Sequence, residues 1–293
     1  MNNEERQKIR AVLTAALSED LGSGDVTSAP LFTRHDRAVA HIQAKGPAVV
    51  SGMAVLRELA AVAGKGLCFT ARVKDGTAVK RNAIVGVFTG PVRTILKIER
   101  LSLNLIGRMS GIASLTREFV KRAGSRAAIL DTRKTTPNLR ILERRAVRDG
   151  GGENHRFGLF DQVLIKDNHI SLYQKKTRTR RSLETVIPVV RSQAPRGMKI
   201  EVEVDTLAQL RVVLPARPDI ILLDNMPVRT LRAAVTMART VARAHRCRVP
   251  LLEASGGITL ATVAAIARTG VDRISVGALT HSAVQKDFSL EIR

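Results

Sequence analysis

Aromatic residues are scarce in this chain, which has one Tyr, no Trp and an aromatic content of 3%. Proteins that bind single-stranded nucleic acid stack bases on aromatic side chains, so this composition argues against that class. Cysteine is equally scarce, and the positions of Cys68 and Cys247 fit neither a metal site nor a disulfide framework. The N-terminus lacks a signal-peptide pattern, and no apolar run reaches the length of a membrane span. We therefore expect a reduced, cytoplasmic protein without a membrane segment.

Acidic residues are also few, since 26 Asp and Glu stand against 48 Lys and Arg and leave a formal charge of +22. This balance indicates anionic partners, and phosphorylated or carboxylated small molecules fit it as well as nucleic acid. The arginines are spread along the chain, so most of them need do no more than raise solubility. A hydrophobic content of 44% over 293 residues is enough for one large α/β barrel or two ordinary domains.

The first 110 residues predict a mixed α+β domain. Apolar side chains at helical spacing predict a helix over 4–17, and short strand-like pieces punctuated by Gly and Pro follow it. The stretch 95–124 predicts a long helix that is broken or kinked near Ser110 and Gly111.

Beyond residue 127, short continuous apolar runs alternate with amphipathic stretches. The runs are "AAILD", "QVLIK", "KIEVEV", "DIILLD", "PLLEA" and "RISVG", and helices are expected over 206–214, 227–245 and 259–269. Parallel strands that are buried on both faces have this pattern, so a βα series forming an α/β barrel is predicted. A doubly wound open sheet is the alternative, but no GxGxxG follows the first strand.

Every predicted strand of this series ends in ionisable residues or glycine. In a βα barrel the carboxyl ends of the strands share the face that carries the active site. One polar strand end usually caps a helix, whereas six at one rim predict a functional site. The residues at these ends are Asp131, Arg133 and Lys134; Lys166, Asp167, Asn168 and His169; Glu203 and Asp205; Asp224 and Asn225; Glu253 and Ser255; and Gly277.

The side chains of this rim fall into two chemical classes. A cluster of cations would repel itself unless it faced water or a polyanion. These cations are Arg133, Lys134, His155, Arg156 and Lys166. Glu203 and Asp224 end the next two strands and suit a divalent cation or a developing positive charge.

Two glycine turns predict a phosphate cradle. Ser255, Gly256 and Gly257 precede a helix that is expected to begin near Thr259, and Gly277 repeats the arrangement. The rim is thus expected to bind a phosphate, a metal-bound diphosphate and a small polycarboxylate.

Eight segments in this order resemble the quinolinate phosphoribosyltransferase family, also called nicotinate-nucleotide pyrophosphorylase (carboxylating). They are "EDLGSGDVTS", "ERLSLNLIGRMSGIAS", "DTRKTTPNLR", "AVRDGGGENHRFGLFDQVLIKDNHI", "EVEVDTLAQL", "ILLDNM", "EASGGI" and "VGALTHS". The resemblance implies an N-terminal open α/β sandwich domain over 1–110 and an incomplete TIM-like α/β barrel over 111–279. Residues 280–293 would pack back on the first domain.

The same resemblance implies the reaction. Family members convert quinolinate and phosphoribosyl pyrophosphate (PRPP) to nicotinate mononucleotide, pyrophosphate and CO₂ in NAD biosynthesis. They use Mg²⁺, held mainly through the PRPP diphosphate, with Glu203 and Asp224 as candidate ligands here. They form homodimers or higher oligomers with shared active sites, and no nucleic acid or membrane partner is implied.

Site residues follow from the resemblance by position. Catalytic roles fall to Lys134, Lys166, Glu203 and Asp224. The expected quinolinate ligands are Arg133, His155, Arg156 and Lys166, with Arg100 reaching the neighbouring subunit's site. The expected PRPP side comprises Lys134, Glu203, Asp224, Ser255, Gly256, Gly257, Val276, Gly277, Ala278 and His281. Thr132 is a further expected substrate-binding residue.

Two features depart from the family pattern. Asn138 occupies a turn position where Gly is usual, and Asn tolerates a positive φ better than other non-glycine residues. The segment 173–181 carries five basic residues where a short loop of small residues is usual. One interpretation is a solvated surface loop. The other is electrostatic steering of anionic substrates, in which case neutralising these basic residues should change kcat/KM and its salt dependence.

Three other functions fit parts of the sequence. A paralogue linked to molybdenum transport, or a ribosyltransferase for another pyridine, would share the scaffold. A Schiff-base aldolase would use Lys166 as its nucleophile, but several cations and no implied apolar pocket surround that residue. A nucleic-acid binder could use 173–181, yet it would leave Glu203 and Asp224 at the strand ends unexplained.

Overall fold

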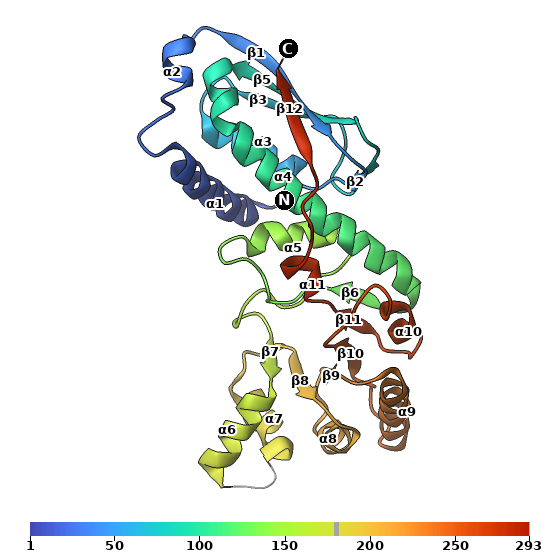
Figure 1. Ribbon diagram of the computed structural model, residues 1–293. Coiled ribbons are helices and arrows are strands. Elements are labelled where there is room, and N and C mark those ends of the chain that lie inside the picture. The colour runs from blue at the N-terminus through green and yellow to red at the C-terminus, as the bar shows by residue number, and fades with distance from the viewer. Residues whose placement is uncertain (179–181, 293) are drawn as a thin grey trace. The chain divides into compact units, whose positions relative to one another are not determined.

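The structure is a computed structural model that describes residues 1–178 and 182–292. It divides into two compact units, shown in Figure 1. The first unit comprises Met1–Arg117, Lys134–Gly152 and Ala278–Arg293, and the second comprises Glu118–Arg133 and Glu153–Gly277. The sequence places one domain boundary near residue 110, whereas this division also groups Lys134–Gly152 with the first unit. Within the two described ranges, no helix combines the length and the apolar content that a membrane span needs.

An antiparallel sheet with the order β12-β1-β5-β3 organises the first unit. Ala40, Ile42 and Ala44 alternate with more exposed residues along β1, so a two-residue period buries one face of the strand. The last strand lies beside the first one (Figure 1), with Ala40 opposite Ile292. The strands of this unit are β1 (Arg37–Ala44), β2 (Ala48–Val49), β3 (Cys68–Ala71), β4 (Ala78–Val79), β5 (Ile84–Pro91) and β12 (Phe288–Ile292).

Helices complete the first unit, and the first of them begins as its sequence dictates. The side chain of Asn2 caps α1 by accepting a hydrogen bond from the Glu5 amide, and Ile9, Leu13 and Leu17 bury one stripe of the helix at a spacing of four. The helices are α1 (Asn3–Leu21), α2 (Ser28–Leu31), α3 (Met53–Ala63), α4 (Val92–Ala123), α5 (Arg140–Asp149) and α11 (Ala278–His281), and the last residues of α4, from Glu118 on, belong to the second unit.

The predicted break near Ser110 and Gly111 is wrong, because α4 runs without interruption from Val92 to Ala123. Gly111 instead lets another segment approach the helix, since a Cβ there would lie 2.3 Å from the Val284 carbonyl oxygen. The Ser110 hydroxyl accepts a hydrogen bond from the Ser51 amide at 3.1 Å. Both residues therefore serve packing within the first unit.

Glu143 of α5 is buried and holds a network whose loss should be costly. Its carboxylate lies 2.7 Å from Arg108 Nη2 and accepts hydrogen bonds from the amide and hydroxyl of Thr136. We expect Glu143→Gln to lower the free energy of unfolding by about 3 kcal/mol, because a buried ion pair loses one partner. Urea unfolding would measure this, with exposed Glu19→Gln as the control that should change stability by less than about 0.5 kcal/mol. Equal effects of the two changes would contradict the network's importance.

The second unit is built on a six-stranded parallel sheet with the order β6-β11-β10-β9-β8-β7. Among the described residues β6 and β7 form its two edges, and only an isolated bridge joins Leu130 of β6 to Glu153. The prediction of an incomplete α/β barrel is thereby confirmed. The strands are β6 (Ala128–Leu130), β7 (Val163–Ile165), β8 (Ile200–Val204), β9 (Ile220–Asp224), β10 (Leu251–Ser255) and β11 (Arg273–Ser275).

Helices and short 3-10 turns connect these strands, except that η1 precedes β6. They are α6 (Asp167–Thr177), α7 (Ser182–Gln193), α8 (Leu207–Val213), α9 (Val228–Ala244), α10 (Val263–Ala267), η1 (Gly124–Arg126) and η2 (Leu214–Ala216). The helix expected over 259–269 is shorter than predicted. Thr259 and Thr262 form a hydrogen-bonded turn in which the Thr262 hydroxyl accepts from the Thr259 amide at 3.0 Å, so the helix begins only at Val263.

Candidate active site

The register of the parallel strands brings Lys166 and Glu203 together. Ile165 of β7 lies opposite Val202 of β8, so the residues that follow them are neighbours at the strand ends. Lys166 Nζ lies 2.5 Å from Glu203 Oε2, and the carboxylate is mostly buried whereas the ammonium is exposed. The two residues, predicted from separate motifs, therefore form one ion pair.

The Lys166 strand end also shows why four polar residues occur in a row. His169 Nδ1 accepts a hydrogen bond from the Lys166 amide at 3.0 Å, and Asp167 Oδ1 accepts from the Asn168 amide at 2.6 Å. Both contacts cap the first turn of α6. Lys166 is thus the member of this group whose charged side chain is directed to another strand end.

The ends of β9 and β10 form a second polar junction. Asp224 lies directly opposite Ser255, and its Oδ2 accepts a hydrogen bond from Asn225 Nδ2 at 2.6 Å. Asn225 has a φ of 52° and donates its amide proton to the Ser255 carbonyl at 2.9 Å. Gly256 has a φ of +89°, and a Cβ there would lie 2.1 Å from Asn225 Oδ1. Glycine is therefore required where the turn meets Asn225.

The expected phosphate turns differ from their prediction in one respect. Gly257 has a φ of +58°, and a Cβ there would meet no atom within 4 Å, so its backbone borders open space. The helix expected directly after this turn is the five-residue α10, and Gly277 precedes the four-residue α11. Neither turn therefore precedes a long helix whose dipole would help to bind a phosphate. Val276 is buried and its amide donates to the Leu130 carbonyl.

A cationic group occupies the second unit near the end of β6. Arg133 is exposed, whereas Arg156 is buried with 8% of its surface accessible. Burial, followed by the nearby charge of Arg133, lowers the pKa of the Arg156 guanidinium. Arg156 Nη1 donates to the Gln162 carbonyl at 3.1 Å. Two neighbouring guanidinium groups, one of them buried, are suited to an anion that compensates their charge.

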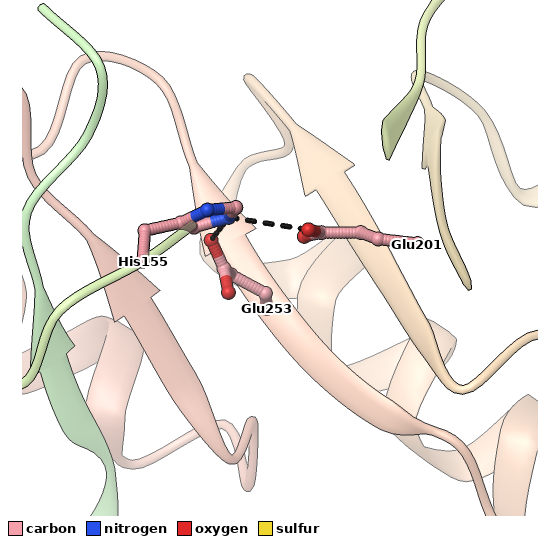
Figure 2. Close-up of side chains that lie close together, drawn as sticks. All are labelled: His155, Glu201 and Glu253. Atoms are coloured by element: carbon pink, nitrogen blue, oxygen red, sulfur yellow. Dashed lines mark ion pairs between the residues drawn. The ribbon is translucent and has the colours of Figure 1, made fainter. Parts of the chain in front are cut away.

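His155 precedes Arg156 in the chain, and its amide and both of its ring nitrogens have polar partners. Its amide donates to the fully buried Asp131 at 2.8 Å, and its Nδ1 accepts from the Arg156 amide at 2.7 Å. Its Nε2 lies 3.2 Å from Glu201 Oε2 and 3.3 Å from Glu253 Oε1, as Figure 2 shows. The ring nitrogens of His155, an expected quinolinate ligand, therefore face the protein's own groups.

Sequence reasoning missed Glu201. In "IEVEV" a two-residue period places Glu201 on the same face of β8 as Glu203, which was the available signal. Glu253 was recognised only as a polar strand end. Both acids are fully buried, and Arg273 Nε lies 3.2 Å from Glu253 Oε2.

Among the described residues, His155, Glu201 and Glu253 are the group whose ligand atoms lie close enough to hold a metal ion. The protonation state of His155 does not suit a metal ion. Because His155 Nδ1 accepts a backbone N–H, Nε2 carries the ring proton and has no lone pair to offer the ion. The cluster is therefore an internal hydrogen-bonded ion-pair network rather than a metal centre.

Opposing influences act on the protonation of His155. Burial by itself lowers its pKa, whereas the hydrogen bonds and charges of Glu201 and Glu253 raise it from the ordinary 6.5 toward about 9. Burial raises the pKa of the Glu201 carboxyl, although the hydrogen bond from His155 opposes the rise. The Arg156 amide opposes double protonation of the ring, since it requires the Nδ1 lone pair.

Because Nδ1 keeps its lone pair for the Arg156 amide, we expect His155 to hold a single ring proton in the folded protein between pH 6.5 and 9.5. Urea unfolding at pH 6.5 and 9.5 tests this, with His155→Gln as a variant that cannot titrate. The change in the free energy of unfolding between the two pH values should agree within about 0.5 kcal/mol in the two proteins. A wild-type advantage at pH 6.5 that is lost by pH 9.5 would show that the two carboxylates outweigh the Nδ1 contact and that the ring is doubly protonated.

Four of the predicted site residues belong to the first unit. Arg100 and Lys134 are exposed, and the Lys134 carbonyl accepts a hydrogen bond from Thr280 at 2.7 Å. His281 is exposed, and its Nδ1 lies 2.6 Å from the Ser282 hydroxyl. Ala278 begins α11. Of the basic segment 173–181, Lys175, Lys176 and Arg178 are exposed, and 179–181 lie outside the described residues.

An incomplete α/β barrel whose strand ends carry cations, carboxylates and glycine turns is typical of enzymes that act on anionic small molecules. Comparison with known families makes this specific. The family model described as "Quinolinate phosphoribosyl transferase, N-terminal domain" matches residues 25–110, and that described as the C-terminal domain matches residues 112–291. The chain belongs to the quinolinate phosphoribosyltransferase family.

Individual relatives agree. The chain is 38% identical over 288 residues to a probable nicotinate-nucleotide pyrophosphorylase [carboxylating] of Bacillus subtilis, covering 97% of this chain and 93% of the relative. It is 39% identical over 289 residues to the enzyme of that name from Mycobacterium leprae, covering 97% and 96%. The solved nicotinate-nucleotide pyrophosphorylase from Francisella tularensis superposes with a TM-score of 0.86 at 33% identity, covering 98% and 97%.

Proposed function

We propose that this chain transfers the phosphoribosyl group of PRPP to quinolinate and decarboxylates the product to nicotinate mononucleotide. The family match over nearly the whole chain supports the reaction. The observation that carries it for these residues is the placing of Lys166 against Glu203 at adjoining strand ends. A cation for an acidic substrate and an acid for a developing positive charge thereby lie side by side.

Quinolinate recognition falls to the cationic side of the site. The two carboxylates of quinolinate would bind among Arg133, Arg156 and Lys166, with Arg133 and Arg156 suited to a carboxylate by their planar guanidinium groups. His155 would act on this side by fixing the Arg156 backbone, because its Nδ1 accepts the Arg156 amide. Arg100 is proposed to reach the site of a partner subunit in a homodimer.

The first chemical step breaks the bond between ribose C1 and the pyrophosphate oxygen. The pyridine nitrogen forms the new bond to C1, and the pyrophosphate departs with the bonding electrons. Positive charge develops on the ribose, where the carboxylates of Glu203 and Asp224 would stabilise it. Lys134 would balance charge on the departing pyrophosphate, and Thr132, His281 and the turns at 255–257 and 276–278 would hold the phosphates.

Mg²⁺ fits the donor set at these strand ends. Glu203 and Asp224 offer carboxylate oxygens, the ligand type that this ion prefers, and they end the neighbouring strands β8 and β9. When bound with PRPP, the ion would supply electrostatic stabilisation of the diphosphate. The protein's own contribution is to hold the two acids, one through Lys166 and the other through Asn225.

The second step releases CO₂ from the quinolinic acid mononucleotide. The bond between C2 and its carboxylate breaks, its electron pair stays on C2, and a proton then replaces CO₂ there. The quaternised ring nitrogen stabilises the carbanion, and Lys166 would stabilise the charge or donate the proton. Homodimerisation, a cytoplasmic location and the absence of nucleic-acid partners stay predictions, as does substrate steering by the basic segment.

Acceptor discrimination tests the proposal against other pyridine ribosyltransferases. With PRPP and Mg²⁺, quinolinate should give nicotinate mononucleotide at a kcat/KM at least about 100-fold above that for nicotinate, because the monoacid lacks one of the two carboxylates that the cationic side of the site would bind. Nicotinamide should give no measurable product. Equal turnover of nicotinate would overturn the proposed substrate.

A further inference from the structure

Four residues of the second unit close a ring of polar contacts around Arg156. The Arg156 amide donates to His155 Nδ1 at 2.7 Å, and His155 Nε2 lies 3.2 Å from Glu201 Oε2. Gln162 Nε2 donates to the same Glu201 oxygen at 2.6 Å. Arg156 Nη1 donates to the Gln162 carbonyl at 3.1 Å, which completes the ring. Both ends of Arg156 are therefore tied to Glu201 through one intervening residue each.

We propose that Glu201 is a positioning residue that sets the orientation of Arg156 for quinolinate binding. This inference rests on the proposed function, because it assigns Arg156 to a substrate carboxylate. Glu201 touches no substrate in this account and acts only through His155 and Gln162. Its single oxygen Oε2 fixes both the start and the end of the segment 155–162.

Burial makes this arrangement rigid. Glu201 is fully buried and Gln162 and His155 are nearly so, which means that water does not compete for their hydrogen bonds. Glu201 Oε1 is also buried and has no hydrogen-bond partner among the described residues. The contacts of this carboxylate with His155 and Gln162 are therefore both made by Oε2. A guanidinium recognises a carboxylate best in one plane, and the hydrogen bond from Arg156 Nη1 to the Gln162 carbonyl helps to set that plane.

The second buried acid provides an internal comparison. Glu253 Oε1 lies 3.3 Å from His155 Nε2, and Glu253 Oε2 lies 3.2 Å from Arg273 Nε (Figure 2 shows the His155 contact). The negative charges of Glu201 and Glu253 are thus balanced by Arg273 and by the N–H group at Nε2 of His155. Glu253 shares the His155 contact with Glu201 but lies outside the ring that runs through Gln162. If Glu201 acts by holding that ring, the two acids should differ in their effect on quinolinate.

Matched variants of the full chain test this. Glu201→Gln should raise the KM for quinolinate tenfold to roughly a hundredfold and change the KM for PRPP less than about twofold, because misplacing one substrate ligand has effects of this size. Glu253→Gln, the same chemical change, should raise the quinolinate KM less than about threefold. In an Arg156→Lys background, Glu201→Gln should add less than about twofold, since coupled residues are not additive.

Several results would overturn the proposal. These are an unchanged quinolinate KM in folded Glu201→Gln, an equal rise in both KM values, equal effects from the two acids, and full additivity with Arg156→Lys. If Glu201→Gln does not fold, Gln162→Met breaks the ring at another point and must show the same selective rise. Failure of the proposed function is a separate outcome, because the wild-type chain would then release no CO₂ from quinolinate.

Discussion

Replacing Lys166 with Met is expected to lower kcat/KM for quinolinate by about 10²–10³-fold, the usual effect of removing one electrostatic stabiliser. The change removes the cation that is proposed to face the substrate and leaves Glu203 without its partner at 2.5 Å. Steady-state assays at saturating PRPP would measure the loss. Lys65→Met is the control, because Lys65 is exposed and lies outside the basic segment 173–181, and it should alter activity less than about threefold.

Lys166→Arg separates the electrostatic role from a Schiff-base nucleophile. Arginine keeps the positive charge, so part of the activity should remain, and borohydride should trap no adduct of the wild-type chain with a carbonyl substrate. A Lys166→Met protein with wild-type kcat/KM would contradict the assigned role. Complete loss in Lys166→Arg together with borohydride trapping would support the aldolase alternative.

Gly256→Ala is expected to disrupt the junction between β9 and β10. A Cβ would lie 2.1 Å from Asn225 Oδ1 at a φ of +89°, so Asn225 must move and the backbone is strained. We expect the free energy of unfolding to fall by about 2–4 kcal/mol and the KM for PRPP to rise at least about tenfold. The KM is expected to rise because Asn225 Nδ2 is the hydrogen-bond donor to Asp224, so a shift of Asn225 also displaces the Asp224 carboxylate.

Gly257→Ala is the matched control for stability. Its Cβ would meet no atom within 4 Å, so only the positive φ of +58° opposes alanine, at a cost of about 1–2 kcal/mol. Urea unfolding and PRPP kinetics on both variants would separate steric overlap from backbone strain. Equal stability of the two variants would show that the Asn225 contact does not constrain Gly256.

The sequence predicts the strands of the barrel well, because continuous apolar runs such as Ile220–Asp224 mark parallel strands that are buried on both faces. It also predicts that Asn138 tolerates a positive φ, and the observed value of 65° confirms this. Glycine in α4 misled the prediction, since Gly111 serves the close approach of Val284 rather than a helix break. Periodicity alone does not distinguish these two uses of glycine.

Side-chain partners at the site were harder to predict than the strands. Lys166 and Glu203 meet because of the register between β7 and β8, which no single segment encodes. Glu201 was overlooked because an acid inside an apolar strand has no motif of its own and acquires its role only through His155 and Gln162. Partner choice depends on which strands become neighbours, and that is a property of the folded sheet.

The stoichiometry of product release tests the central claim most directly. Quinolinate labelled in its 2-carboxyl group should release one CO₂ for each pyrophosphate formed from PRPP, and neither product should form when either substrate is left out. Pyrophosphate without CO₂, CO₂ without PRPP, or no release of either would contradict the account.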